Sequence, residues 1–363
     1  MGQWGGTVEI LGGIALNLDF YRGKKVFVTG HTGFKGAWLC YMLAKAGALV
    51  TGYALQPPTQ PNLFALCGVE GQMVSVIGDV RDFKTLQAVY NQASPEIVFH
   101  LAAQPIVRES YVNPRETFDT NVMGTVNLLE CIRQHGGAKS VVNVTTDKVY
   151  LNNEWAWGYR ENDPLDGFDP YSNSKSCSEL VTHSYINSFF SDAGIPVSTA
   201  RAGNVIGGGD FAADRIVPDC IRAVLKGEKI QVRNPHSTRP YQHVLEPLAA
   251  YLMIAQRQYE TPSFAGYYNI GPDDSDCVTT EKLVDLFCHF WGEGAQWAAK
   301  AVKGPHEANF LKLDCSKLRS VFNWQPRWHI EEAIENTVLW VKALNAGQDI
   351  EQEMDRQIAL FFS

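Results

Sequence analysis

The stretch KVFVTGHTGFKGAWLCYMLAKA, at residues 25–46, constrains this chain more than any other. Its apolar run VFV predicts a buried parallel strand, and the apolar residues after the turn recur at helical spacing. The three glycines between them allow positive φ and a close approach of backbone to ligand, so free N–H groups at a helix N-terminus can face a pyrophosphate. Such triplets also arise by chance among 31 glycines, but the flanking strand and helix favour a dinucleotide-binding turn. The predicted contacts in this turn are Gly30, Thr32, Gly33, Phe34 and Gly36.

Composition excludes several classes of protein. The chain has 363 residues, 45% of them hydrophobic, which is enough for a doubly wound domain and a smaller second one. A net charge of −8 without a basic run argues against a nucleic-acid partner. The eight cysteines show no CxxC spacing, which indicates reduced thiols, a cytoplasmic location and no metal site. Residues 1–18 have neither a basic region nor a long apolar span, so we expect an extension ahead of the fold and no membrane segment.

Strands and helices are predicted to alternate over the first two hundred residues. The predicted strands lie near residues 26–28, 48–55, 73–77, 96–101, 140–144 and 195–200, and the helices near 34–46, 82–93, 114–133 and from 170 onward. This alternation predicts an α/β fold with a doubly wound parallel sheet of the Rossmann type. We expect a dinucleotide-binding domain at 19–203, with return segments near 240–275, and a smaller, mainly substrate-binding domain at 204–345. Later elements are predicted at 213–225, 248–255, 267–270 and 330–344, the final helix.

Two strand ends are predicted to contact the dinucleotide, and a third bears on which dinucleotide it is. The second strand ends at Tyr53, Ala54 and Leu55 and lacks the acidic residue that would hold the ribose hydroxyls of NAD, so NAD and NADP are not separated at this point. The third strand ends in an aspartate, and the fourth runs into small residues that suit a flat cofactor. The contacts predicted at these two ends are Asp79, Val80, Leu101, Ala102, Ala103 and Gln104.

Reactive side chains follow the fifth strand. Thr146, Asp147 and Lys148 stand at the carboxyl end of a parallel strand, where open α/β sheets bind ligands. Of three Tyr-x-x-x-Lys pairs in the chain, only Tyr171 and Lys175 begin a helix just after this strand. The two share a helix face, where a lysine ammonium and a nicotinamide cation would favour phenolate over phenol and create a general base.

The motifs TGHTGFKG, LAAQP, TTDK and YSNSK, in this order, resemble those of the extended short-chain dehydrogenases/reductases, over about residues 19–342. More closely, TTDKVY, GYRENDP, DPYSNSK, RAGNVIGGGD, RNPHSTRPYQHVLEPL and HEANFLKLD resemble the nucleotide-sugar 4,6-dehydratases of bacterial dideoxysugar synthesis, in the branch that uses CDP-glucose. In the dTDP-glucose branch the strand-end motif is Thr-Asp-Glu, with the aspartate as acid for the C6 hydroxyl and the glutamate as C5 base. This chain has Lys148 in place of that glutamate, which fits the cytidine branch and leaves the C5 base open.

The resemblance implies an internal redox cycle with NAD as a retained cofactor. Tyr171 takes the C4 hydroxyl proton as hydride passes from C4 to NAD, water leaves across C5 and C6, and the hydride returns to C6, so that CDP-glucose becomes CDP-4-keto-6-deoxyglucose. Asp147 is then the acid, Thr146 the partner of the 4-oxygen and Lys175 the residue that orients Tyr171. The substrate contacts implied are Asn121, Asn204, Arg215, Arg233, Arg239 and His306. An asparagine beside a core face, as Asn121 is, is more often a satisfied structural amide.

Two rival functions share part of this pattern. Another nucleotide-sugar 4,6-dehydratase or a nucleotide-sugar 4-epimerase would keep Tyr171, Lys175 and the glycine turn, but an epimerase does not need the acid and base that Asp147 and Lys148 offer. A non-catalytic module that senses NAD would not need Tyr171 and Lys175. The resemblance also implies a homodimer, or a tetramer made of such dimers, built on the helices at 114–133 and 171–190. The apolar positions that support this are Val126, Leu129, Leu180 and Ile186.

Overall fold

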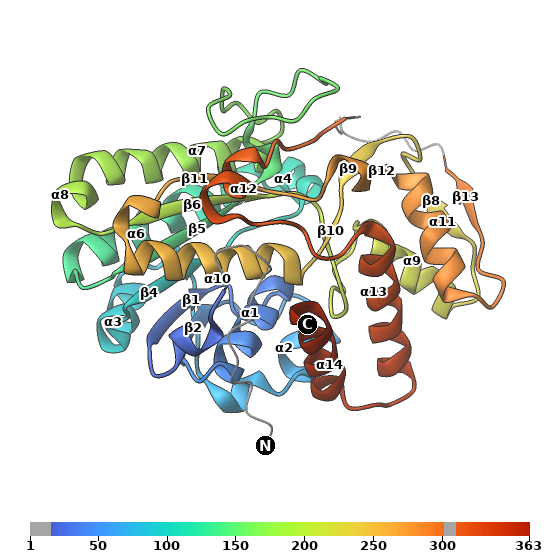
Figure 1. Cartoon of the computed structure of the whole chain (residues 1–363), viewed down its shortest axis with the longest axis horizontal. Coiled ribbons are helices and arrows are strands. Elements are labelled where there is room, and N and C mark those ends of the chain that lie inside the picture. The colour runs from blue at the N-terminus through green and yellow to red at the C-terminus, as the bar shows by residue number, and fades with distance from the viewer. Residues whose placement is uncertain (1–15, 301–309) are drawn as a thin grey trace.

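The computed structural model describes residues 16–300 and 310–363. At its centre is a seven-stranded sheet with the order β11-β6-β5-β4-β1-β2-β3, in which all neighbours are parallel (Figure 1). The strands are β1 (Lys25–Thr29), β2 (Leu49–Ala54), β3 (Val74–Ile77), β4 (Ile97–His100), β5 (Ser140–Thr146), β6 (Val197–Ala202) and β11 (Tyr267–Ile270). The strand order reverses its direction at β1, which confirms the predicted doubly wound α/β fold.

Alternate residues of each inner strand enter two different cores. Val26 and Val28 of β1 pack into the core shared with α1 (Phe34–Lys45) and α10 (Leu245–Glu260), whereas Phe27 packs into the core on the opposite face. Helices α3 (Phe83–Ala93) and α6 (Gly124–His135) cover that second face. Burial on both faces explains why the strands are continuous apolar runs rather than alternating ones.

The remaining helices and short strands surround this sheet. The helices are α2 (Leu63–Leu66), α4 (Val107–Val112), α5 (Pro114–Phe118), α7 (Pro170–Tyr185), α8 (Ser191–Ala193), α9 (Ile216–Leu225), α11 (Thr280–Trp291), α12 (Ser316–Phe322), α13 (Ile330–Asn345) and α14 (Ile350–Phe362). The short strands pair as β10 (Gln242–His243) with β7 (Val205–Ile206), β12 (Cys277–Thr279) with β9 (Thr238–Pro240), and β13 (Trp297–Ala299) with β8 (Ile230–Val232). In Figure 1, α9, α11, β8 and β13 lie to one side of the sheet, beyond α13.

Two long helices contain a wide turn that the sequence pattern did not predict. The predicted helix at 114–133 is α5 and α6 joined by a π-helical turn, η3 (Asp119–Met123). Helix α7 likewise continues through a π-helical turn, η5 (Ile186–Phe190), into α8. A π turn accommodates one extra residue, and such turns are frequent at functional sites.

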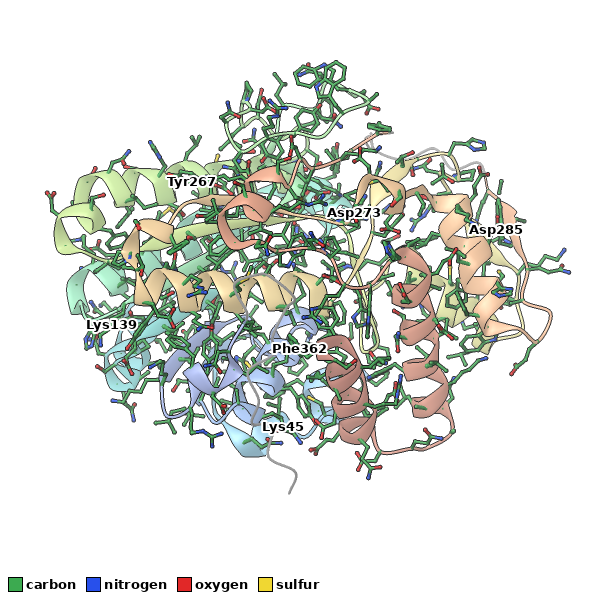
Figure 2. The ribbon with its side chains drawn as sticks, in the orientation of Figure 1. Lys45, Lys139, Tyr267, Asp273, Asp285 and Phe362 are labelled. Carbon is green, nitrogen blue, oxygen red and sulfur yellow. The ribbon has the colours of Figure 1, made fainter. Side chains whose placement is uncertain are left out.

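The helix predicted to be the last one is not the last. It is found as α13, but α14 follows, packs on α13 and bonds to α1, the helix that begins at the glycine turn. Tyr41 of α1 donates a hydrogen bond of 2.6 Å to the Asp355 carboxylate, and Lys45 pairs with the same carboxylate at 3.1 Å. Figure 2 shows Lys45 on the side of the molecule where α14 and Phe362 lie.

Of the predicted N-terminal extension at 1–18, residues 1–15 lie outside the described chain. Leu16 is buried, and Tyr21 donates a hydrogen bond of 2.6 Å to the Leu252 carbonyl of α10. All eight cysteines are free thiols, as predicted. Within residues 16–300 and 310–363, no helix has the length and apolar character needed to cross a membrane.

Candidate active site

A cavity of about 1140 Å³ runs along the carboxyl ends of the strands, between the sheet and the segments that carry β7, α9 and β8. Most of the predicted site residues line it. These are Gly30, Thr32, Gly33, Phe34, Gly36, Asp79, Val80, Leu101, Ala102, Ala103, Thr146, Asp147, Lys148, Tyr171, Lys175, Asn204, Arg215, Arg233 and Arg239. Gln104 and Asn121 are not part of the lining, and His306 lies outside the described residues.

The glycine turn is so tight that it has no room for side chains at Gly30 and Gly36, as in a turn that presents its backbone to a dinucleotide. Gly30 has φ of +78°, and a Cβ there would lie 2.7 Å from the backbone nitrogen of Ala102. A Cβ at Gly36 would collide with the backbone of Gly30, so the first turn of α1 lies directly on the turn that precedes it. Gly33 is the N-cap of α1 and makes no side-chain cap, which leaves the first N–H groups of the helix facing the cavity.

Gln104 and Asn121 brace the cavity wall from behind. The Asn121 side chain accepts from the Gln104 backbone N–H at 2.8 Å and donates to the Gln104 carbonyl at 3.1 Å and to the Ser174 hydroxyl at 2.8 Å. Asn121 lies in the π turn η3 and is 1% exposed. Its amide is therefore committed to joining the end of β4 to α7, the helix that carries Tyr171.

Asp79 anchors the far end of the cavity. Its carboxylate accepts three hydrogen bonds from the Arg81 guanidinium, the shortest at 2.6 Å, and these bonds lower the pKa of Asp79. The next residue, Val80, packs directly on Gly124: a Cβ on Gly124 would lie only 2.7 Å from Val80 Cγ2. The end of β3 is therefore a rigid rim for the cavity.

The strand-end trio combines a buried acid with a basic side chain. Asp147 is 1% exposed, Thr146 donates a 2.9 Å hydrogen bond to its Oδ1, and its Oδ2 has no hydrogen-bond partner among the described residues. Burial raises the pKa of Asp147, although Lys148, Thr146 and Arg239 act against this. A carboxyl with a raised pKa that lines a cavity is suited to donate a proton. Lys148 is half-buried and lines the cavity next to it.

Tyr171 and Lys175 come from the first turns of α7, as predicted. Asp169 caps this helix by accepting from the Ser172 N–H at 3.0 Å, and Pro170 occupies its first position. Burial raises the pKa of Tyr171 to about 12, against the lowering effect of a hydrogen bond with the Thr146 side chain. The general base predicted here therefore depends on positive charge that arrives with a ligand.

Lys175 is a buried lysine, and burial is the main influence on its pKa. It is 3% exposed, and its ammonium donates a 2.9 Å hydrogen bond to the Val144 carbonyl of β5. Burial lowers its pKa to about 8, while Glu179, one turn further along α7, acts to raise it. Lys175 can therefore lose or gain a proton close to neutral pH.

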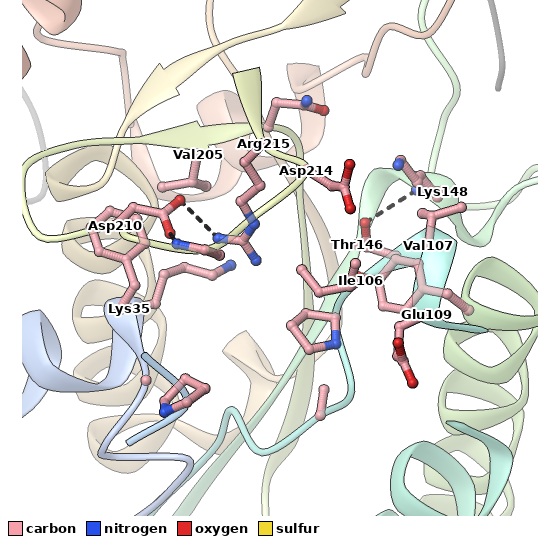
Figure 3. Close-up of a pocket in the computed structure, with 18 of the residues that line it drawn as sticks. Lys35, Ile106, Val107, Glu109, Thr146, Lys148, Val205, Asp210, Asp214 and Arg215 are labelled. Atoms are coloured by element: carbon pink, nitrogen blue, oxygen red, sulfur yellow. Dashed lines mark hydrogen bonds and ion pairs between the residues drawn. The ribbon is translucent and has the colours of Figure 1, made fainter. Parts of the chain in front are cut away.

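Sequence reasoning missed Lys35, the second residue of α1. It lines the cavity, and burial together with Arg215 and Lys175 lowers its pKa to about 7, while Asp147 acts to raise it. Figure 3 shows Lys35 directed toward Asp210 and Arg215, with Thr146 and Lys148 on the opposite wall. Its position inside the glycine motif was the available signal, but the helical apolar pattern gave no reason to single it out.

Two of the three predicted substrate arginines, Arg215 and Arg233, are held by carboxylates. Arg215 pairs with Asp210 at 2.9 Å, and Arg233 pairs with Asp214 at 2.6 Å and with Asp219 at 3.2 Å. Arg239 is 7% exposed and donates to the Thr238 carbonyl at 2.9 Å. Asn204 lines the cavity, and its carbonyl accepts from the Gln242 N–H at 2.9 Å.

One group of described side chains has the composition of a metal site. Asp273, Asp276 and His329 lie close together at the start of α13, outside the cavity lining. His329 and Asp276 pair at 2.8 Å, and Asp276 also accepts from the Ile330 N–H, so the cluster caps the helix. Asp273 pairs with Arg319. The absence of a metal cofactor stays a prediction.

Comparisons with known proteins agree on the type of enzyme. The family model described as GDP-mannose 4,6 dehydratase matches residues 27–337. The chain is 50% identical over 354 residues to the CDP-glucose 4,6-dehydratase of Salmonella typhimurium strain LT2, covering 96% of this chain and 99% of the relative.

Solved structures with lower identity share the fold. The UDP-glucose 4-epimerase of Thermotoga maritima with UDP-glucose superposes with a TM-score of 0.77 at 22% identity, covering 88% of this chain and 99% of the other. The dTDP-glucose 4,6-dehydratase of Bacillus anthracis in complex with NAD gives 0.72 at 21% identity, covering 89% and 98%.

Proposed function

Since the chain belongs to the GDP-mannose 4,6-dehydratase family, we propose that it is a lyase that converts CDP-glucose to CDP-4-keto-6-deoxyglucose with bound NAD. The observation that carries the substrate assignment is the 50% identity, over nearly the full length of both chains, to a CDP-glucose 4,6-dehydratase. The arrangement of Asp147, Lys148, Tyr171 and Lys175 in one cavity supports the same reaction.

The residues that would hold NAD are those of the glycine turn and of the ends of β3 and β4. Any Cβ at Gly30 would collide with the backbone of Ala102, so only glycine lets this turn lie against the end of β4, and the free N–H groups at the start of α1 suit a diphosphate. Bound NAD would supply a hydride acceptor for C4 and a hydride donor for C6. Because the same hydride returns to the sugar, the cofactor is neither consumed nor released by the chemistry.

The chain's own groups then divide the proton transfers. Tyr171 takes the proton of the C4 hydroxyl, and Thr146 orients the oxygen that becomes the 4-keto group. Asp147, whose pKa is raised by burial, gives a proton to the leaving C6 hydroxyl. Lys148 is the adjacent basic side chain: it removes the C5 proton, which the 4-keto group has made more acidic, and gives a proton back to C5 when the hydride returns to C6. Lys175 positions Tyr171 and the nicotinamide ribose.

Nucleotide-sugar 4-epimerases share the fold, but the strand-end trio favours dehydration. An epimerase returns hydride to C4 and needs no acid or base at C6 and C5. The buried carboxyl of Asp147, with Oδ2 unpartnered among the described residues, is a proton donor with no task in an epimerase.

Incubation of the purified protein with CDP-glucose should give a product with the alkaline absorbance of a 4-keto-6-deoxy sugar, without net formation of NADH. The physical reason is that the hydride accepted from C4 goes back to C6 of the same molecule. The measurement is absorbance at the nicotinamide band during steady turnover, with CDP-mannose and UDP-glucose as comparison substrates. Steady accumulation of NADH would identify a simple dehydrogenase, and turnover of UDP-glucose alone would overturn the cytidine assignment.

We also propose a cytoplasmic homodimer, formed by the helices α5 to α6 and α7 to α8 of two copies. Exposed apolar side chains on these helices are Met123 (46%), Leu180 (55%) and Phe189 (43%). Leu129, part of the sequence argument, is buried in the core of its own subunit and adds nothing to this surface. Two copies related by a twofold axis would bury these faces in a four-helix contact.

Sedimentation at micromolar concentration should therefore show a dimer or a tetramer. Leu180→Glu should shift the protein toward monomers, since it places a charge in the proposed contact. Leu360→Glu, at a similarly exposed apolar site on α14 (48%), should not. A monomeric wild-type protein would contradict the proposal.

A further inference from the structure

The charges that line the cavity nearly cancel. The lining includes seven basic residues, Lys35, Arg108, Lys148, Lys175, Arg215, Arg233 and Arg239, and eight acidic residues, Asp79, Glu109, Asp147, Glu154, Asp169, Asp210, Asp214 and Asp219. A cavity that binds a sugar nucleotide must nevertheless accept a diphosphate with two or more negative charges. Three of the lining arginines, Arg108, Arg215 and Arg233, are paired with carboxylates, so a diphosphate that binds them competes with those carboxylates.

Asp214 is the carboxylate placed to do this. Its Oδ1 lies 2.6 Å from Arg233 Nη1, just after β8, and 3.8 Å from Arg108 Nε, on α4. These two arginines belong to opposite walls, because α4 follows β4 of the sheet and β8 belongs to the later segments. Figure 3 shows Asp214 between Arg215 on one wall and Val107 on the other. Asp214 thus links the two walls by ion pairs.

The link is weak enough to be displaced. The Asp214 side chain is 40% exposed and those of Arg233 and Arg108 are 26% and 31% exposed, so each ion pair is worth little in water. A diphosphate offers more charge and more acceptor oxygens to the same guanidinium groups, and charge-assisted bonds to phosphate are strong. Asp210 differs, because its side chain is only 5% exposed and also accepts from the Ala212 N–H at 3.2 Å.

We propose that Asp214 is an internal competitor of the substrate diphosphate, which holds Arg233 and Arg108 across the cavity mouth until the nucleotide displaces it. This inference rests on the proposed function, since it takes the ligand to be a nucleoside diphosphate sugar. It makes Asp214 a specificity-determining residue. A ligand without a diphosphate cannot displace the carboxylate, so the pairs disfavour weakly charged nucleosides and nucleotides.

The test compares wild type with Asp214→Asn by calorimetric titration of CDP, inorganic pyrophosphate and cytidine. Asparagine suits this position because Asp214 has φ of +60°, a conformation that asparagine adopts more readily than most residues. The variant should bind CDP and pyrophosphate about three- to tenfold more tightly at low salt, and the gain should shrink as salt rises. Cytidine affinity should not change. The matched control is Asp19→Asn. Asp19 also pairs with an arginine, Arg22, and its side chain is also 40% exposed, but it lies outside the cavity lining.

The outcomes separate the competitor role from the proposed function. Unchanged or weaker CDP and pyrophosphate binding by Asp214→Asn would overturn the competitor role while leaving the function intact. An equal gain for cytidine would overturn it as well, because the effect would not depend on the diphosphate. Pyrophosphate binding without any CDP binding by wild type would overturn the cytidine assignment, and a gain for pyrophosphate in the variant would still support Asp214 as the competitor.

Discussion

Replacement of Lys148 by methionine should leave oxidation at C4 largely intact and slow the loss of water by about 10²- to 10⁴-fold, the usual range for a general base. Lys148 is the basic side chain adjacent in sequence to Asp147 in the cavity lining, so its loss removes the base and not the acid of the elimination. Bound NADH should therefore build up on the enzyme in the presence of CDP-glucose. Rapid mixing with detection of reduced nicotinamide measures this directly. Lys84→Met, at an exposed position on α3, is the matched control and should behave as wild type.

Isotopes identify which step the variant blocks. Wild type in D₂O should place deuterium at C5 of the product, and deuterium supplied at C4 of the substrate should migrate to C6 of the same molecule. In Lys148→Met, exchange at C5 should slow in parallel with turnover. Turnover of the variant at the wild-type rate would exclude Lys148 as the C5 base and make Tyr171 the next candidate. Loss of the C4 label to solvent would contradict the hydride cycle itself.

Lys175→Met should abolish measurable turnover and at the same time stabilise the folded protein at pH 7. Burial lowers the pKa of Lys175 from 10.5 to about 8, so the folded state holds this charge at a cost on the order of 3 kcal/mol at neutral pH. Methionine removes that cost but leaves the Val144 carbonyl without the lysine's 2.9 Å hydrogen bond, a loss of about 1 kcal/mol. The net gain should be about 1–2 kcal/mol, seen as a higher melting temperature.

The gain should depend on pH in a defined direction. Between about pH 8 and 10.5 the unfolded wild type binds a proton at Lys175 that the folded protein lacks, so wild-type stability from this group rises with pH across that window. The advantage of Lys175→Met should thus be full below pH 8 and vanish toward pH 10.5. Lys342→Met is the control, because Lys342 donates to the carbonyls of Phe290 and Trp291 and its loss should only destabilise. A fall in stability for Lys175→Met at pH 7 would show that the ammonium is structural.

Sequence patterns predicted the sheet because its inner strands are buried on both faces. Apolar runs of that kind occur at the predicted positions of β1, β2, β4, β5 and β6, and strand β11 was predicted at its observed bounds. The position of Tyr171 and Lys175 could be predicted as well, since an Asp-Pro cap fixes where α7 begins. These features depend on residues near one another in the chain.

Features that depend on distant residues could not be predicted. Asp214 and Arg108 are separated by more than a hundred residues, and no local pattern indicates that they pair. The lowered pKa of Lys35 arises from burial by the folded chain and from Arg215 and Lys175, not from its neighbours in sequence. The π turn at Asn121 follows from hydrogen bonds to Gln104 and Ser174, which a helical periodicity does not contain.

The bonding of α14 to α1 sets an order of events during synthesis. Tyr41 and its partner Asp355 are 314 residues apart, and ribosomes add roughly 5–20 residues per second, so α1 waits about 15–60 s for the helix that bonds to it. During that interval the Tyr41 hydroxyl lacks its acceptor on Asp355, and Lys45 lacks its ion-pair partner. The first part of the cofactor site to leave the ribosome therefore completes its hydrogen bonds only near the end of synthesis.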